Sequence, residues 1–388
     1  KLRFPGFDEP WQTTLLSSVF AKNTQKNTDG RITNVICNSA KQGLIPQREY
    51  FDKNIANSDN TNGYYIIEEN DFVYNPRKSA DAPYGPISSY KYTEAGIVSP
   101  LYLCFRAKKE INPAFFEWYF RSSAWHRYVY MSGDSGARHD RVSIKDDTFF
   151  AMPINIPSAH EQAQIAIFLE RIEQRIEMQR ALVDSLKKYK RGVVAAIFSH
   201  QLKFSDATGN PYPEWTSCTL QDAVDFLDGQ RKPLESADRA KRQGQYPYYG
   251  ASGIIDYIDD FIFDEPLLLL GEDGANILNR STPLCFIAEG KYWVNNHAHV
   301  MRPKAGQNIK FLCELLESLD YTRYNTGTAQ PKLNQDKCRR IGLALPVYEE
   351  QCHIADFLSA FDQRTDKAQS ILDYLLSNRD GLLQQLFI

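Results

Sequence analysis

The sequence predicts an α+β protein with two globular domains of mixed helix and strand, joined by two long antiparallel coiled-coil helices in a pseudo-twofold internal repeat. Three observations lead to this prediction. Residues 160–175 return as residues 349–364, with an offset of 189 throughout. Each copy opens a long stretch that has heptad periodicity and no proline. The residues before each copy are instead rich in aromatic and turn-forming residues.

The repeated segment reads HEQAQIAIFLERIEQR in its first copy and EEQCHIADFLSAFDQR in its second, and the same register continues to the strings RGVVAAIF and DGLLQQLF. Upstream, Trp11 with Leu16 and Trp215 with Leu220 share the spacing W-x4-L, at an offset of 204. Little sequence between these matches can be aligned. A period of about 200 residues is far too long for a solenoid, so the pattern indicates a duplicated module of two parts.

Both copies are predicted to begin helices. From Ile165, positions spaced alternately by four and three residues are apolar in eight of ten cases, and the same count holds from Ile354. Such a seam is typical of a coiled coil. Pro157 and Pro346 stand just before the helices, where a helix tolerates proline. Each helix is expected to span about 40 residues and therefore about 60 Å.

The seams carry a basic residue at the same position of each copy, Lys190 and Arg379. Two arrangements agree with the seams. The helices either pair with each other inside one chain, or each packs separately on its own domain. We favour an intramolecular antiparallel pair, because the seams run too long for a small domain to cover.

The helices divide the chain into four expected parts, which are residues 1–155, 156–205, 206–345 and 346–388. The first and third parts contain strand-like runs, such as GYYIIEE, GIVSPLYLCF, LLLLGED and CFIAEGKYWV. They also contain the helix-like runs INPAFFEWYFRSSAWHRYVY and NIKFLCELLESLDYTRY, the first with Asn112 as N-cap and Pro113 at the first helical position. We interpret each part as one α+β domain without a firm topology.

Polar, turn-rich loops carry most of the residues that could be functional. In the first domain these loops read NSAKQG, YNPRKSADAPYG and MSGDSGARHDR. In the second they read LDGQRKP, RQGQYPYYGASG, GEDGAN, VNNHAHV and NTGTAQPKLNQ. Their Arg, Lys, Asn, Gln, Ser and Tyr suit contacts with phosphates and base edges, although ordinary loops use nearly the same residues.

Composition sets outer limits. The net charge of −3 and the pI of about 6.2 neither require nor exclude nucleic acid, since local basic loops matter more than the sum. The seven cysteines are scattered without a CxxC pair, which is typical of free thiols in a reducing cytoplasm and not of a zinc ribbon. No apolar run is long enough to span a membrane. The chain begins without Met, so we expect residues before Lys1.

No catalytic constellation stands out. Asp273 with Glu289 and Lys291 has the spacing D-x15-E-x-K of a Mg²⁺-dependent nuclease core, but EGK is also an ordinary hairpin turn. His297 and His299 would lie on one face of a strand, and without a third ligand a structural role is favoured over a metal site. GEDGAN lacks the Lys-Ser/Thr of a phosphate-binding loop. We therefore predict no catalytic residue and no metal ligand.

The architecture resembles the specificity subunit of Type I restriction–modification systems. Several strings carry the resemblance: IPSAHEQAQIAIFL and LPVYEEQCHIADFL at the helix starts, YPYYGASG, GEDGAN and NTGTAQPKLNQD in the second domain, and the closing GLLQQLF. It extends over essentially the whole chain and is weakest inside the first domain, where MSGDSGARHDRVS stands in place of NTGTAQPKLNQ.

The resemblance implies a DNA-binding subunit that is not itself an enzyme. Each target-recognition domain would read one half of an asymmetric bipartite site in double-stranded DNA, and the helix pair would set the spacing between the halves. Two modification (methyltransferase) subunits would dock on the helices, and restriction (translocase) subunits would complete the complex. The chain would bind no cofactor, and S-adenosylmethionine, ATP and Mg²⁺ would belong to its partners.

From this resemblance and the loops we select candidate residues. The DNA-contact candidates of the first domain are Lys41, Arg77, Lys78, Arg138 and Arg141. Those of the second are Arg231, Lys232, Tyr248, Tyr249, Ser252, Gln330 and Lys332. The partner-docking candidates are Glu161, Gln162, Glu350 and Gln351, which could equally cap the helix starts. Two other functions stay open: a stand-alone nuclease that uses the D-x15-E-x-K residues, and a scaffold whose domains bind proteins.

Overall fold

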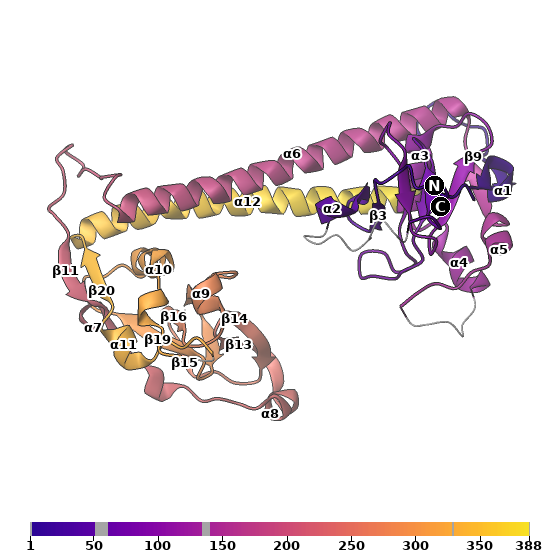
Figure 1. Ribbon diagram of the computed structural model, residues 1–388. Coiled ribbons are helices and arrows are strands. Elements are labelled where there is room, and N and C mark those ends of the chain that lie inside the picture. The colour runs from indigo at the N-terminus through magenta and orange to yellow at the C-terminus, as the bar shows by residue number, and fades with distance from the viewer. Residues whose placement is uncertain (1, 51–60, 134–139, 328–329, 388) are drawn as a thin grey trace. The chain divides into compact units, whose positions relative to one another are not determined.

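The computed structural model describes residues 2–50, 61–133, 140–327 and 330–387 (Figure 1). The chain forms two compact units, Lys1–Arg180 with Ser370–Ile388 as unit 1 and Ala181–Gln369 as unit 2. Both boundaries fall inside the long helices α6 (Ala159–Phe198) and α12 (Tyr348–Leu386), so each helix contributes one half to each unit. No described helix is both long and apolar enough to cross a membrane.

Unit 1 consists of short strands and helices that precede α6. The strands are β1 (Gln12–Leu15), β2 (Phe20–Lys22), β3 (Ile36–Ser39), β4 (Gly43–Pro46), β5 (Tyr65–Ile67), β6 (Phe72–Tyr74), β7 (Ile87–Ser89), β8 (Gly96–Val98), β9 (Leu103–Ala107) and β10 (Pro153–Ile156). The helices are α1 (Leu16–Val19), α2 (Gln47–Tyr50), α3 (Pro113–Arg121), α4 (His126–Ser132) and α5 (Asp146–Phe150).

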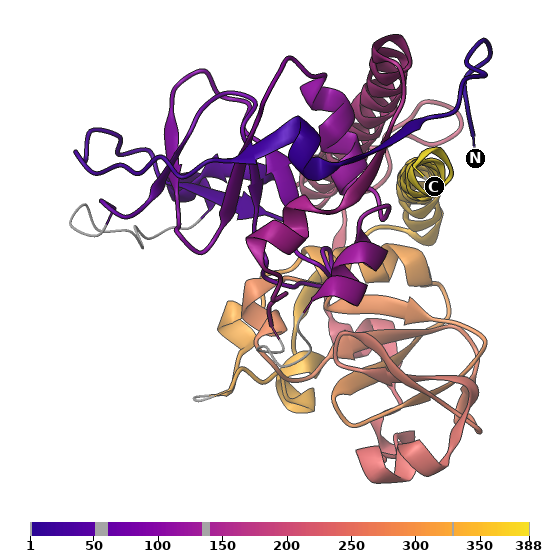
Figure 2. The same ribbon diagram turned by 90° about the vertical axis from the view of Figure 1, so that its right-hand side faces the viewer.

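Unit 2 has the same kind of composition, and Figure 2 shows its strands, in pink and orange, from a second side. The strands are β11 (Thr216–Thr219), β12 (Val224–Phe226), β13 (Gln243–Gly250), β14 (Gly253–Ile258), β15 (Phe263–Asp264), β16 (Leu267–Gly271), β17 (Cys285–Ala288), β18 (Lys291–Val294), β19 (Ala298–Pro303) and β20 (Gly342–Leu345). The helices are α7 (Leu220–Ala223), η2 (Asp228–Gln230), α8 (Ser236–Lys241), α9 (Asn276–Asn279), α10 (Ile309–Ser318), η3 (Thr322–Tyr324) and α11 (Gln335–Arg339).

The two units share one frame although their sequences hardly align. Each has a four-stranded antiparallel sheet, with the order β2-β9-β6-β7 in unit 1 and β12-β19-β16-β17 in unit 2. Each also has a two-stranded sheet that joins the first strand to the strand before the long helix, β1 with β10 and β11 with β20. The internal repeat therefore extends through both domains and is not limited to the helices.

Matching side-chain contacts hold this frame in both units. Asn112 and Asn308 cap α3 and α10, each accepting a hydrogen bond of 3.0 Å from the backbone three residues on. Lys108 and Lys304 each donate from Nζ to a backbone carbonyl of the short first helix, both at 2.6 Å. The prediction of a helix that starts with Asn112 and Pro113 is confirmed, but that helix ends at Arg121 and α4 follows separately.

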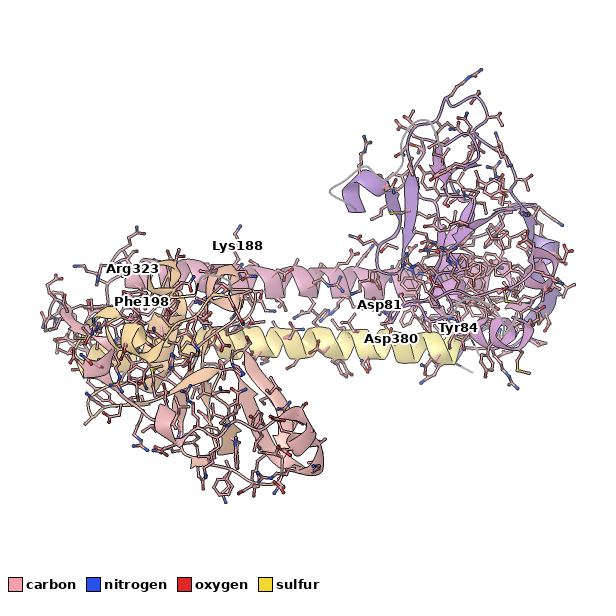
Figure 3. The ribbon with its side chains drawn as sticks, turned by 60° about the horizontal axis from the view of Figure 1, so that its bottom comes forward. Asp81, Tyr84, Lys188, Phe198, Arg323 and Asp380 are labelled. Carbon is pink, nitrogen blue, oxygen red and sulfur yellow. The ribbon has the colours of Figure 1, made fainter. Side chains whose placement is uncertain are left out.

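The W-x4-L anchors explain how each unit is closed. The Trp11 ring lies 6.2 Å from the ring of Phe387 at the end of α12, and the Trp215 ring lies 6.2 Å from that of Phe198 at the end of α6. Figure 3 labels Phe198 within unit 2. Each domain therefore packs its anchor tryptophan at the end of the helix that started in the other unit, on Phe198 within α6 and on Phe387 directly after α12.

The helix prediction is confirmed in length and in periodicity. The two helices have 40 and 39 residues and begin two residues after the predicted prolines. All seam positions counted from Ile165 and from Ile354 are buried or half-buried. Beside the seam of unit 2, the exposed Tyr189 of α6 has its ring 5.6 Å from that of Phe361 of α12.

Charged residues pair across the seam in both units. In unit 2, Lys190 Nζ lies 2.6 Å from Asp362 and 2.7 Å from Glu314 of α10, and Lys310 contacts the same two carboxylates at 2.6 and 2.7 Å. In unit 1, Arg379 lies 3.2 Å from Glu173, the position equivalent to Asp362. The basic residue shared by the two seams is therefore paired with an acid of the other helix each time.

The units differ in the sheets that lie outside the shared frame. Unit 1 adds the separate pairs β3-β4 and β5-β8, and unit 2 adds one sheet with the order β14-β13-β18-β15. The expected hairpin at EGK is wrong, because β17 pairs with β16 while β18 pairs with β13 and β15. The turn at Gly290 thus carries the chain from the shared sheet to the sheet found only in unit 2.

The Asp362 cluster supports a stability prediction. The pKa of Asp362 is lowered: burial would raise it, but hydrogen bonds from Lys190 and Lys310 outweigh that effect. We expect Asp362→Asn to reduce the free energy of unfolding by about 1–2 kcal/mol at pH 7, because the carboxylate is partly solvated. A carboxyl whose folded pKa is lowered stabilises above its unfolded pKa, and this contribution disappears as the pH falls through the folded value.

Urea denaturation at several pH values, followed by tryptophan fluorescence, measures this difference. Wild type and Asp362→Asn should converge at acid pH. Asp356→Asn, at an exposed position of the same helix, serves as the control and should match wild type at every pH. A difference between Asp362→Asn and wild type that persists unchanged at acid pH would contradict the prediction.

Candidate nucleic-acid interface

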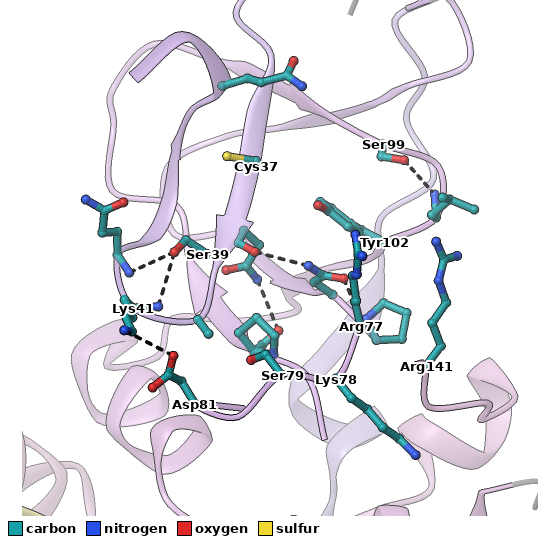
Figure 4. A pocket seen from close by; sticks show the side chains of 18 residues that line it. Cys37, Ser39, Lys41, Arg77, Lys78, Ser79, Asp81, Ser99, Tyr102 and Arg141 are labelled. Carbon is teal, nitrogen blue, oxygen red and sulfur yellow. Dashed lines mark hydrogen bonds and ion pairs between the residues drawn. The ribbon is translucent and has the colours of Figure 1, made fainter. Parts of the chain in front are cut away.

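A hollow of about 890 Å³ in unit 1 brings together four of the five DNA-contact candidates of the first domain (Figure 4). Lys41, Arg77, Lys78 and Arg141 line it together with Tyr102. Lys41 lies on one side beside Asp81, and the two arginines lie on the side of Tyr102. Arg138 lies outside the described residues.

Two of the predicted loops are joined along one edge of this hollow. Arg77 and Arg141 pair as an antiparallel β-bridge. Backbone hydrogen bonds from Lys78 to Asp140 (2.9 Å) and from Val142 to Pro76 (2.8 Å) flank the bridge. Gly85 allows the YNPRKSADAPYG loop to turn back tightly. Its φ is +82°, and a Cβ there would lie 2.1 Å from the Asn75 carbonyl. The two guanidinium groups are therefore carried on a fixed backbone.

The floor of the hollow is a buried polar network around Asn38. Its side-chain amide donates to the Val73 carbonyl at 2.8 Å, and its side-chain oxygen accepts from Ser88 Oγ at 2.9 Å. Asn75 donates to the Asn38 carbonyl at 3.2 Å. The first residue of the NSAKQG loop thus has an internal role, and the loop presents Lys41 from a rigid base.

The electrostatics of the hollow favour an anion. Lys41 Nζ lies 3.5 Å from Asp81, whereas Arg77, Lys78 and Arg141 form no ion pair with any residue that the structure describes. The Arg141 Nε is buried and has no hydrogen-bond partner among the described residues. Burial raises the pKa of Tyr102, against the opposing charge of Arg77. A phosphate group or a base edge would supply the acceptors that these donors lack.

In unit 2 four of the five predicted loops meet at one buried cluster of charged side chains, and the fifth adjoins it. Asp228 contacts the His299 Nδ1 at 2.7 Å and accepts from the Val300 N–H and the Gln335 amide, both at 2.8 Å. Arg231 donates to Glu272 at 2.8 Å. The hairpin between β13 and β14 joins this group through Tyr249, whose carbonyl accepts from the Asn295 N–H at 3.0 Å.

Four candidates of the second domain are exposed around this cluster: Lys232, Ser252, Gln330 and Lys332. Lys332 Nζ lies 3.4 Å from Glu272, and Lys332 also forms a β-bridge with Asp273. Tyr249 is half-buried, with its ring 5.7 Å from that of Phe286, and burial raises its pKa. Its ring therefore has a packing role in addition to any contact with a ligand.

Two candidates of the second domain lie in positions that do not suit DNA contact. Tyr248 is 1% exposed, and its hydroxyl accepts from the Leu234 N–H at 2.9 Å, so it belongs to the core. The Arg231 side chain is 14% exposed and donates to Glu272 and to the carbonyls of Asp228 and Ala298. Alternate side chains of a strand lie on opposite faces. Both faces of β13 are covered where Tyr248 and Tyr249 stand, which the sequence pattern does not reveal.

The partner-docking candidates are also mostly internal. Glu161 is buried and paired with Arg3 through two hydrogen bonds of 3.0 and 2.8 Å. Gln162 is half-buried and Gln351 is buried, and each donates at 3.0 Å to the carbonyl of the proline that precedes its helix. Glu350 is buried, which raises the pKa of its carboxyl. Of the two interpretations of these residues, fixing the helix starts agrees with this geometry, and docking does not.

The nuclease alternative finds no assembled site. Asp273 contacts the His297 Nδ1 at 2.8 Å, and Lys291 lies over the ring of Phe261 and 4.0 Å from Asp264. Among the described residues, no group of three His, Cys, Asp or Glu side chains could hold a metal ion. His297 and His299 do not share a strand face, because β19 begins at Ala298 and His297 lies in the preceding turn.

That turn contains residues which the sequence analysis did not select for DNA contact. Asn296 and His297 are exposed next to Lys332, because Asp273 contacts the His297 ring and also pairs with the Lys332 backbone. The quoted loop VNNHAHV was a signal for them, but a His pair at i, i+2 first suggests a strand. The interface of unit 2 therefore includes Asn296 and His297 as candidates.

Comparisons with known proteins agree on one family. The model of the Type I restriction modification DNA specificity domain matches residues 9–188 and again 212–375. A Haemophilus influenzae protein named as a type I restriction enzyme specificity subunit is 32% identical over 155 residues, which cover 40% of this chain and 38% of that protein. The Escherichia coli EcoprrI specificity subunit is 28% identical over 39% of this chain and 37% of its own length.

Solved structures resemble the fold along the whole chain. The S subunit of a Type I restriction-modification system from M. genitalium aligns with a TM-score of 0.58 at 16% identity, covering 100% of this chain and 98% of its own. A chain from a study of assembly and conformational transition in the type I R-M system aligns with a TM-score of 0.61 at 14% identity, covering 98% of both chains. These similarities show the fold, and the two family matches cover most of the sequence. The chain therefore belongs to the family of Type I restriction–modification DNA specificity subunits.

Proposed function

We propose that this chain is the non-catalytic, sequence-reading subunit of a Type I restriction–modification complex, with each domain reading one half of an asymmetric bipartite target. The observation that carries the proposal is the combination of one shared frame with two unlike sets of loops. A repeated frame would hold both domains in the same way on the helix pair. Different loops and outer sheets would then read different bases.

In the first domain the proposal assigns DNA contact to the hollow lined by Lys41, Arg77, Lys78 and Arg141. The arginines suit guanine edges or phosphates, and the lysines suit phosphates. In the second domain it assigns contact to Lys232, Ser252, Gln330 and Lys332, with Asn296 and His297 added. Arg231 and Tyr248 would support the loops from inside.

For partner docking the proposal uses the outward faces of the helices, since the residues at the helix starts are buried. These faces carry exposed large apolar side chains: Ile167, Met178, Leu182 and Tyr189 on α6, and Phe357, Ile371 and Tyr374 on α12. Apolar groups of this kind fit the helices of two modification subunits. S-adenosylmethionine, ATP and Mg²⁺ would be bound by the modification and restriction subunits.

Methylome sequencing of a host that carries the complete system tests the proposal directly. We expect methylated adenines in one asymmetric motif with two specified halves and an unspecified spacer of constant length. Footprinting of the chain with its modification partner should protect both halves. A complex that protects no bipartite sequence would contradict the proposal and favour a protein-binding scaffold.

The hollow of unit 1 can be tested by Arg77→Ala with Arg141→Ala. The double variant, in complex with the modification subunits, should bind the mapped target more weakly. If the arginines bind phosphates, the slope of log K against log salt should fall by about 0.9 for each phosphate that the variant no longer neutralises. If an arginine reads a base instead, its removal should weaken binding by about 1–3 kcal/mol and relax the first half-site alone.

The matched control for this double variant is Lys203→Ala. Lys203 is exposed in unit 2 and is paired only loosely, at 3.5 Å, with Glu214. Its removal should change neither the affinity nor the salt slope. Unchanged binding by a folded Arg77→Ala, Arg141→Ala variant would exclude the hollow from the interface.

Removing one heptad from each long helix tests the helix pair as a ruler. A heptad is about 10 Å long and keeps the seam in register. We expect the methylated motif to keep both half-sites while its spacer changes by about three base pairs, at 3.4 Å per base pair. Altered half-sites with an unchanged spacer would contradict the ruler.

A further inference from the structure

The charged cluster of unit 2 lies beneath the loops to which we assign DNA contact. Four loops each contribute to it: Asp228 comes from η2, Glu272 follows β16, His299 stands on β19, and Leu333 precedes α11. Figure 1 shows that β16, β19 and α11 gather in one region of unit 2. The loops therefore converge on a common base.

The hydrogen bonds of His299 connect two of these loops. The side chain is fully buried, its Nε2 lies 2.7 Å from the Leu333 carbonyl, and its Nδ1 lies 2.7 Å from the Asp228 carboxylate. A carbonyl only accepts, so Nε2 carries a hydrogen. Asp228 also accepts from the Val300 N–H and the Gln335 amide, so every polar atom of the two side chains has a partner. His299 and Asp228 thus form a buried hydrogen-bonded pair.

An ion pair between Arg231 and Glu272 connects this pair to the remaining loops. Arg231 donates to Glu272 at 2.8 Å and lies 3.6 Å from Asp228, and Glu272 Oε2 lies 3.8 Å from the His299 Nδ1. The Glu272 carbonyl accepts from the Leu333 N–H at 2.7 Å. Asp228 and Glu272 both lie beside Arg231 and His299, so removal of one member leaves a buried polar or charged group without its partner.

The buried members stand next to the exposed candidates along the chain. Glu272 is followed by Asp273, Leu333 is preceded by Lys332, and His299 stands two residues after His297. The side chains of the cluster therefore fix the backbone from which the exposed side chains project. Buried charges with complete partners restrict a backbone more sharply than apolar packing, because a displaced partner loses both its hydrogen bonds and its solvation.

We propose that Asp228, Arg231, Glu272 and His299 form a positioning cluster that determines the specificity of the second half-site without contacting DNA. The inference rests on the proposed function and names residues for it that lie outside the interface. Loops held by a closed network meet base edges in one arrangement. Loops released from it would meet them in several, so that a wrong base is rejected less well.

The test uses the complex of this chain with its modification subunits and duplex oligonucleotides that carry the mapped target. Each duplex has one base pair changed in either the first or the second half-site. His299→Gln keeps a polar side chain but cannot donate to both acceptors. We expect it to reduce discrimination against wrong base pairs in the second half-site by about 5- to 150-fold, which is the full contribution of one base pair, and to leave the first half-site unchanged.

Gln335→Ala is a milder second variant, because it removes only the 2.8 Å hydrogen bond from the last loop to Asp228. It should relax the second half-site in the same direction and to a smaller degree, and it keeps the inference testable if His299→Gln does not fold. Lys310→Met is the matched control. It breaks a partly buried ion cluster of the same unit that touches none of these loops, so it should lower thermal stability and leave discrimination intact.

Each outcome decides between the two proposals. Unchanged discrimination in the folded variants overturns the positioning cluster alone. Equal relaxation of both half-sites, or relaxation of the second by Lys310→Met, also overturns it, because general destabilisation of the unit would then explain the effect. A wild-type complex that shows no bipartite preference overturns the proposed function and this inference with it.

Discussion

The mutual burial of two helix seams is the constraint on which the rest of this structure depends. The seam positions of α6 and α12 are buried or half-buried, and each helix ends against the anchor tryptophan of the unit in which it did not begin. Backbone carbonyls at matching positions near the two helix ends also have similar partners. The Gln385 carbonyl accepts from the Leu2 N–H at 3.0 Å, and the Ala196 carbonyl accepts from the Leu202 N–H at 2.9 Å. As a result, the core of unit 1 is completed only by Leu383, Leu386 and Phe387 from the far end of the chain, whereas unit 2 is built from the continuous stretch Ala181–Gln369, which holds one half of each long helix.

This constraint divides the molecule into parts that must stay alike and parts that are free to differ. The four-stranded sheet, the capped helix behind it and the lysine beneath it appear in both units, because they seat each domain on the helices. Other strands do not belong to this shared frame, namely the β3-β4 and β5-β8 pairs of unit 1 and the β14-β13-β18-β15 sheet of unit 2. They bear or adjoin the loops with the candidate DNA contacts, so variation can accumulate there without affecting the frame.

The distribution of charge also follows from burial. The chain has a net charge of −3, and several of its acids are paired with basic side chains inside the protein, as Glu161, Asp228 and Glu272 show. Among the described residues that line the hollow of unit 1, Asp81 is the one acid beside four basic side chains. The lining of this hollow is therefore basic although the whole protein is slightly acidic, and a sum over composition could not have indicated this.

The sequence by itself determined the features that depend on periodicity: two helices of about 40 residues, their seams, their starting points after Pro157 and Pro346, and the duplication. These are local or repeated patterns, and a heptad leaves few alternatives. Only the tertiary structure decided which loop residues face solvent. Tyr248 and Arg231 looked like surface residues of polar loops, but neighbours distant in sequence cover the first and pair the second. Burial is a property of what packs on a residue, and neither the shared frame of the two domains nor the charged base of the second interface is encoded in any short stretch of the chain.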